Sequence, residues 1–211
     1  MRKFFTILYS FFSLSAFAQI DSIAYSRDYE FNEGVFFTVN QFKKNTPIPK
    51  QVIVSAIPSS QLDFLKQVME EKYFSYKDSA GIEQKVETKS LWGYCQNRSV
   101  YINFNNEFNK LVVIGTLGYF TAMIVTTVGF HDPMNYNYGL NNTADEMHQF
   151  VFDSQSNKVL DFNVANMERL LKNDADLYNQ FMAIKKRQKS DAIFVYLRKY
   201  NEKHPLYLPQ K

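Results

Sequence analysis

The sequence is poor in cysteine and histidine, and both shortages restrict the chemistry open to it. A single cysteine, Cys95, means that no disulfide can form within the chain, so the folded state depends on packing alone. As a nucleophile, Cys95 would need a neighbouring base and an electropositive setting, and the sequence around it offers neither. Only three histidines are present from which a zinc or transition-metal site could be built.

Recognised catalytic motifs are missing as well. The sequence contains no HExxH, GxSxG or CxxC and no phosphate-binding glycine loop. Serines and threonines are too numerous for any one to be selected as a nucleophile without such a motif. The sequence therefore assigns no catalytic residue, no cofactor and no metal.

The N-terminus has the pattern of a secretory signal. Arg2 and Lys3 precede an uncharged apolar run over residues 4–17, and Ala16-Phe17-Ala18 places small residues at the two positions that signal peptidase reads. We therefore expect a signal peptide over residues 1–18 and an exported protein that is periplasmic or secreted. Since no cysteine follows the expected cleavage site, we expect no lipid anchor there.

Charge gives no reason to expect nucleic acid as a partner. The formal net charge of +3 falls to +1 when Arg2 and Lys3 are removed with the signal. A chain this close to neutrality has no overall electrostatic attraction to nucleic acid or to anionic lipid. The expected partner is an unknown protein or small molecule in the cell envelope.

The densest run of aromatic and β-branched residues lies over residues 90–130. Within it, residues 91–95 and 100–104 alternate with period 2 around turn residues 96–99, which predicts a β-hairpin. Pairing Cys95 with Val100 sets the register. The core face then carries the following pairs: Cys95 with Val100, Gly93 with Ile102, and Leu91 with Phe104.

The opposite face of this hairpin is aromatic. The same register places Tyr94 opposite Tyr101 and Trp92 opposite Asn103. Such a face either packs beneath a helix or stands open as a platform for a ligand, and packing is the more common use of buried aromatics. Trp92, Tyr94 and Tyr101 are therefore a candidate surface for binding a ligand, and packing beneath a helix is the alternative role for them.

The remaining pattern predicts one α+β domain over residues 19–211. A helix is expected over 38–44, where Thr38-Val39-Asn40-Gln41 has the pattern of a capping box. A second is expected from Ser60, with Leu62, Leu65 and Met69 on its buried face. Three more are expected over 164–173, 175–188 and 190–203, within a C-terminal helical segment, 164–203, for which Asn163 is the expected N-cap. Between them we expect an antiparallel meander sheet of about six to eight strands, covered by the N-terminal and C-terminal helices.

Residues 111–130 permit two interpretations. They carry no charge and are long enough to cross a bilayer. Their glycines, threonines and many β-branched residues favour two successive soluble strands, broken near residues 115–118. We therefore expect no transmembrane span, and a membrane-inserted accessory protein is kept as an alternative.

The loop over residues 131–148 holds the one constellation with chemical potential. His131 and Asp132 lie at its start, and Glu146 and His148 lie at its end. If the loop folds back, two imidazoles and two carboxylates would meet, which is enough for a metal or acid/base site. The spacing matches no recognised motif, so ordinary loop polarity is favoured, with a small hydrolase or metal-dependent enzyme as the alternative function.

Three segments together resemble a known family. The segments are FNEGVFFTVNQFKKNTP at 31–47, LWGYCQNRSVYINFNNEF at 91–108 and LRKYNEKHPLY at 197–207. They resemble a family of exported bacterial proteins of unknown function, in which E-G-x-[YF], W-G-[YF] followed by x-Y-I, and Y-N-x-x-H-P recur in this order. The resemblance implies a secreted or periplasmic domain with no assigned activity. We accordingly expect a non-catalytic interaction or binding module.

We predict that the precursor is cut after Ala18, so that the exported protein begins at Gln19. The reason is the charged and then apolar run that ends in small residues at the two positions before the cut. Intact-mass measurement of the protein recovered from outside the cytoplasm tests this. Retention of Met1, or a first residue well away from Gln19, would contradict it.

Overall fold

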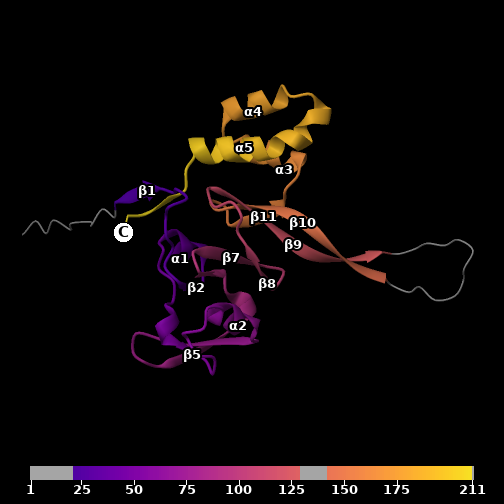
Figure 1. Ribbon diagram of the computed structural model, residues 1–211. Helices are drawn as coiled ribbons and strands as arrows, with labels where there is room; N and C mark the ends of the chain where they lie inside the picture. The colour runs from indigo at the N-terminus through magenta and orange to yellow at the C-terminus, as the bar shows by residue number, and fades with distance from the viewer. Residues whose placement is uncertain (1–20, 129–141, 211) are drawn as a thin grey trace, which may run out of the picture.

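The computed structural model describes residues 21–128 and 142–210. Its elements form layers, with a helical unit, a long β-hairpin, a four-stranded sheet and a small α+β unit following one another (Figure 1). The signal expected over residues 1–18 lies outside the described residues, as do His131 and Asp132.

The four-stranded sheet lies in the middle of these layers. It consists of β2 (Gly34–Phe36), β6 (Gly93–Gln96), β7 (Ser99–Phe104) and β8 (Glu107–Lys110), in the order β2-β6-β7-β8. The predicted hairpin register is confirmed: Cys95 pairs with Val100, Tyr94 with Tyr101 and Gly93 with Ile102.

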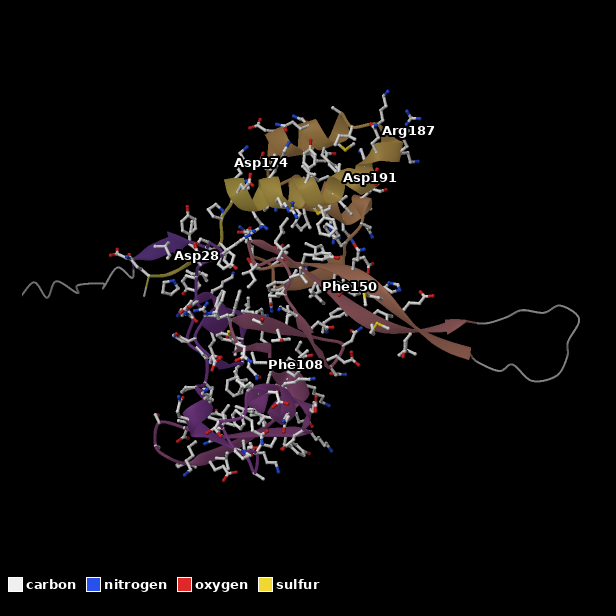
Figure 2. All side chains as sticks on the ribbon, in the orientation of Figure 1. Asp28, Phe108, Phe150, Asp174, Arg187 and Asp191 are labelled. Atoms are coloured by element: carbon white, nitrogen blue, oxygen red, sulfur yellow. The ribbon has the colours of Figure 1, made fainter. Side chains whose placement is uncertain are left out.

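Both faces of this sheet are buried. Cys95, Val100 and Ile102 belong to one hydrophobic core, which also contains residues of the long hairpin. Tyr94 belongs to another core, against which Phe108 packs on the side of the sheet toward α2 (Phe64–Glu70) (Figure 2). The sheet is therefore the shared wall of two cores.

The faces of Trp92 and Leu91 are the reverse of those predicted. Trp92 packs in the core of Ile102, and Leu91 packs in the core of Tyr94. The strict alternation fails because β6 begins only at Gly93, after the 3₁₀ turn η2 (Thr88–Ser90). Residues before the strand do not follow its pleat, so period-2 counting does not extend to them.

The small α+β unit covers one face of the central sheet. It contains η1 (Lys50–Val52) and three strands, β3 (Ile53–Val54), β4 (Tyr73–Lys77) and β5 (Glu83–Glu87), in the order β3-β4-β5. Helix α2 buries Leu65 and Met69 as predicted. Leu62, predicted to share their face, is exposed because it precedes the first turn of the helix.

The long hairpin covers the other face of the central sheet. It consists of β9 (Leu117–Val128) and β10 (Asn142–Asp153), with β11 (Lys158–Asp161) added along the base of β10. Successive residues alternate between two cores: Phe120 and Phe150 face the central sheet, whereas Tyr119 and Val151 face the helices. The two strands expected over 111–130 are thus one long strand, preceded by irregular backbone.

Three C-terminal helices pack on the outer face of the hairpin. They are α3 (Val164–Leu171), α4 (Ala175–Met182) and α5 (Lys189–Lys203), with the 3₁₀ turn η3 (Lys186–Gln188) before α5. Asn163 caps α3 and Asp174 caps α4 through their side chains. The chain then returns to the N-terminal side, where β12 (Tyr207–Pro209) pairs with β1 (Ser22–Ala24).

The N-terminal helix is shorter than the C-terminal ones. Helix α1 (Val39–Lys43) begins at the predicted capping box, in which the Thr38 side chain accepts from the Gln41 amide. Gln41 in turn accepts a hydrogen bond from the amide of Phe37. These two bonds satisfy donors that would otherwise be unpaired at the start of the helix.

The α+β class is confirmed, but the expected single meander sheet is wrong. The described strands form four small antiparallel sheets. Period-2 alternation identifies strands without specifying which of them pair, and three of the sheets are joined through side-chain packing instead of a continuous hydrogen-bond ladder. In the part of the chain that the structure describes, no helix is long and apolar enough to cross a membrane.

We predict that Ile102→Ala lowers the free energy of unfolding by about 2–5 kcal/mol, the usual range for truncating a buried isoleucine. The side chain is 2% exposed in the core between the sheet and the hairpin. Denaturant unfolding measures the change. Ile82→Ala, at a 60% exposed position, is the matched control. An equal and small effect of the two substitutions would contradict the register.

Candidate functional site

A polar groove opens where the central sheet meets the base of the long hairpin. It has a volume of about 620 Å³ and is lined from distant parts of the chain. Thr38 stands at the start of α1, Lys89 comes from η2, Asn103 from β7, and Asn157 from the turn between β10 and β11. Trp92 and Phe152 supply apolar lining.

Trp92 is the most unusual residue of this groove. Its ring stacks on Phe42 at 4.6 Å between centroids and contacts Phe36 and Phe152 edgewise or tilted, and the residue is 9% exposed. Its indole Nε1 is buried and donates no hydrogen bond within the described residues. A buried donor without a partner lowers the stability of the fold, so a hydrogen-bond acceptor supplied to this indole group would be stabilising.

A second unpaired group lies next to the groove. The Thr88 hydroxyl is buried without a hydrogen-bond partner among the described residues. It lines a smaller pocket of about 210 Å³, to which Lys89 and Asn106 also belong. Because Lys89 and Asn106 line the groove too, the two hollows adjoin.

Asparagine side chains dominate the polar lining. Asn105 and Asn106 form the two-residue turn between β7 and β8 with positive φ, and Asn157 has φ of 55° in its own turn. Turn geometry alone explains why asparagine occurs at these positions. The consequence for the groove is that three carboxamides, each able to donate and accept, are gathered at its rim.

Asn103 is tied to the wall of the groove. Its Nδ2 donates to the carbonyls of Lys89 and Leu91, at 2.9 Å in each case. These bonds leave the carboxamide oxygen as the acceptor that this side chain can offer to a ligand. Of the described residues in the lining, Lys89 is the one with a charged side chain, and its ammonium pairs with Glu87 at 3.0 Å. The groove is therefore close to neutral.

The structure brings together half of the predicted loop site. Glu146 and His148 share one face of β10, with His148 Nε2 3.3 Å from Glu146 Oε2, and both side chains are solvent-exposed. His131 and Asp132 lie outside the described residues. Among the residues that are described, no group of three or more His, Cys, Asp or Glu side chains is placed to hold a metal ion.

The predicted aromatic face is divided between two cores. Tyr94 and Tyr101 stack at 4.6 Å between ring centroids, and Phe108 packs edgewise on Tyr94. Helix α2 contributes Leu65 and Val68 to the same core. Burial raises the pKa of the Tyr94 hydroxyl, as expected for a phenol withdrawn from water. The pair lies beneath α2 and is not an open platform, whereas Trp92 faces the groove side.

One polar cluster was not found by sequence reasoning. Asp174 caps α4 and is 3% exposed at its side chain, and it accepts from Lys203 Nζ at 2.9 Å, from the Leu177 amide at 3.0 Å and lies 2.7 Å from His204 Nε2. Hydrogen bonding from Lys203, followed by that from Leu177, holds the pKa of Asp174 well below its usual range. The cluster joins the start of α4 to the end of α5.

A family model for a family of unknown function, DUF6563, matches residues 34–204. The chain belongs to this family. No curated protein matches the sequence, and no solved structure matches it.

The short motifs that resemble a family of unknown function have structural roles in this chain. Gly34 has φ of 146°, and a Cβ there would lie 2.2 Å from the carbonyl oxygen of Ile48. At Gly93 the same atom would lie 2.1 Å from the carbonyl oxygen of Tyr101. A side chain at Gly34 would push β2 away from Ile48, and a side chain at Gly93 would push β6 away from β7. The E-G-x-[YF] and W-G-[YF] motifs of this DUF6563 chain therefore include glycines that let β2 approach Ile48 and β6 approach β7.

The third motif, Y-N-x-x-H-P, anchors α5 to β9 and to the start of α4. Tyr200 is buried in the helical core, and His204 contacts Asp174. Asn201 accepts from the Leu117 amide and donates to the Leu117 carbonyl, each at 2.8 Å. Its carboxamide thus extends the β9 ladder and ties the last helix to the base of the hairpin. The partner of His204 is the buried carboxylate of Asp174, at the start of α4.

We predict that Asp174→Asn lowers the free energy of unfolding near neutral pH and that its difference from wild type shrinks below about pH 4. A depressed folded-state pKa contributes stability above the unfolded-state value, and this contribution disappears as pH falls toward the folded-state pKa. Asparagine also caps helices well, so the substitution isolates the charge.

Denaturant unfolding at a series of pH values measures this effect. Asp176→Asn is the control, because Asp176 also pairs with Lys203 but is 79% exposed, and solvent screens such a pair. A difference between wild type and Asp174→Asn that is constant from neutral to acidic pH would refute a role for the charge.

Proposed function

We propose that this protein is an exported, non-catalytic binding module that holds a neutral, hydrogen-bonding ligand in the groove of Trp92, Asn103 and Asn106. The ligand is a small molecule of the cell envelope, or part of a protein there. The observation that carries the proposal is that Trp92 lines a groove surrounded by carboxamides, while its buried indole Nε1 has no hydrogen-bond partner among the described residues.

The chemistry of the lining supports a neutral ligand. Carboxamides and hydroxyls donate and accept, and the one ammonium among the described lining residues, that of Lys89, has a carboxylate partner in Glu87. A phosphate or carboxylate ligand would instead call for arginines or unpaired lysines. Hydroxyls, amides and backbone-like groups are therefore the functional groups that the groove suits.

A non-catalytic role is supported by what surrounds the groove. Among the described residues, its lining contains no histidine and no carboxylate that could serve as an acid or base. The exposed pair Glu146 and His148 lies on the long hairpin and is not part of the lining. The alternative of a loop-centred enzyme would require His148, so His148→Ala separates the two: the proposal expects binding to persist in this variant.

We predict that Asn106→Gly combined with Asn157→Gly reduces capture of the ligand from an envelope extract at least about tenfold, since roughly 1.4 kcal/mol of lost hydrogen bonding corresponds to that factor. Glycine preserves the positive φ of both turns while removing the carboxamides. Immobilised protein is incubated with the extract, and bound material is quantified by mass spectrometry.

The control is Asn97→Gly. Asn97 also has positive φ in a hairpin turn, but it lies outside this groove. Trp92 is the only tryptophan of the chain, so its emission gives a second readout when captured material is added back. Equal capture by wild type, the double variant and Asn97→Gly would overturn the groove as the binding site.

A further inference from the structure

The distal half of the long hairpin projects beyond the rest of the fold (Figure 1). We call residues 121–128 of β9 and 142–149 of β10 the arm. In the arm each strand pairs only with the other among the described residues, since β11 pairs with β10 only from Phe150 to Asp153. Among the described residues, no further strand therefore pairs with either outer edge of the arm, and at its base the Gln149 carbonyl accepts a hydrogen bond from the Phe162 amide.

Apolar side chains are exposed on one face of the arm. Met123 and Met147 are directly opposite each other, and Val125 follows on the same face. Their exposed fractions are 45%, 70% and 66%. The helices cover this face only at the base of the hairpin, over Tyr119 and Val151. An isolated two-stranded ribbon is only marginally stable in water, and a third strand would be stabilising.

Charge distinguishes the two open edges. The β9 strand of the arm, TAMIVTTV, contains no ionisable residue, whereas the β10 strand includes Asp145, Glu146 and His148. Charged side chains on an edge strand oppose pairing with a like strand, and an uncharged, β-branched edge favours it. Two copies of β9 can meet without repulsion, while two copies of β10 would bring their carboxylates together.

We propose that the arm is a dimerisation surface, in which β9 of one chain pairs antiparallel with β9 of a second copy about a two-fold axis. Antiparallel pairing of identical strands is self-complementary, so the interface closes and does not propagate. The sheets β11-β10-β9 of the two copies then become one continuous sheet. Met123 and Val125 of both copies form one apolar face with Met147.

Sedimentation velocity on the mature chain over about a hundredfold range of concentration tests the proposal. Wild type is expected to shift from the mass of one chain to that of two. Met123→Lys with Val125→Lys should raise the dimer dissociation constant at least about tenfold, because like charges then face each other across the new ladder. Circular dichroism verifies that this variant is folded.

Two controls make the result specific. Val195→Lys changes an equally exposed apolar residue on α5 and should leave the dissociation constant unchanged. Asp145→Asn with Glu146→Gln removes both carboxylate charges of the β10 strand of the arm and should also leave the dissociation constant unchanged. Tighter association in this second control would overturn the choice of edge, and a wild-type chain that is monomeric at every concentration would overturn dimerisation itself.

Cysteine cross-linking fixes the register of the pairing. Single substitutions Thr121→Cys, Met123→Cys and Val125→Cys place a thiol at successive positions on one face of β9. The position nearest the two-fold axis should form an intermolecular disulfide on mild oxidation, and Gln149→Cys on β10 should not. Wild type controls for Cys95, which is buried. Equal cross-linking of Gln149→Cys would contradict pairing through β9.

Discussion

The structure depends on the burial of the β6–β7 hairpin on both of its faces. Ile102 and Val100 pack toward the long hairpin, while Tyr94 packs toward α2, so neither neighbouring unit has a complete core without this sheet. Gly93 lets β6 approach β7, and Gly34 lets β2 approach the backbone of Ile48, because a Cβ at either position would clash. The shared wall thus holds together units whose strands are not joined in a single ladder.

The candidate binding groove is a consequence of the same arrangement. It opens where the central sheet meets the base of the long hairpin, and Trp92 contributes to both the core and the groove. The buried ring is held rigidly by Phe42 and Phe36, so its indole group is fixed in place before any ligand arrives. The arm, by contrast, leaves the layered body, which separates a surface suited to self-association from one suited to a ligand.

Sequence patterns predicted those features that depend on neighbouring residues. The register of Cys95 with Val100, the capping box at Thr38 and the capping residue Asn163 all follow from local spacing. Trp92 and Leu91 were misplaced because the 3₁₀ turn before β6 interrupts the alternation. The division into four sheets, the Asp174–His204 contact and the groove join residues far apart in the chain, and nothing in local periodicity encodes such pairings.

Hydrogen exchange tests the shared-wall account most directly. Amides of β6 and β7 should exchange only through global unfolding, with an opening free energy equal to that from denaturant unfolding, because both faces of these strands are covered. Amides of β4 and β5, at the outer side of the small unit, should exchange at lower free energy through local opening. Exchange of the β6 and β7 amides at a free energy below that of β4 and β5 would contradict the central place of this hairpin in the fold.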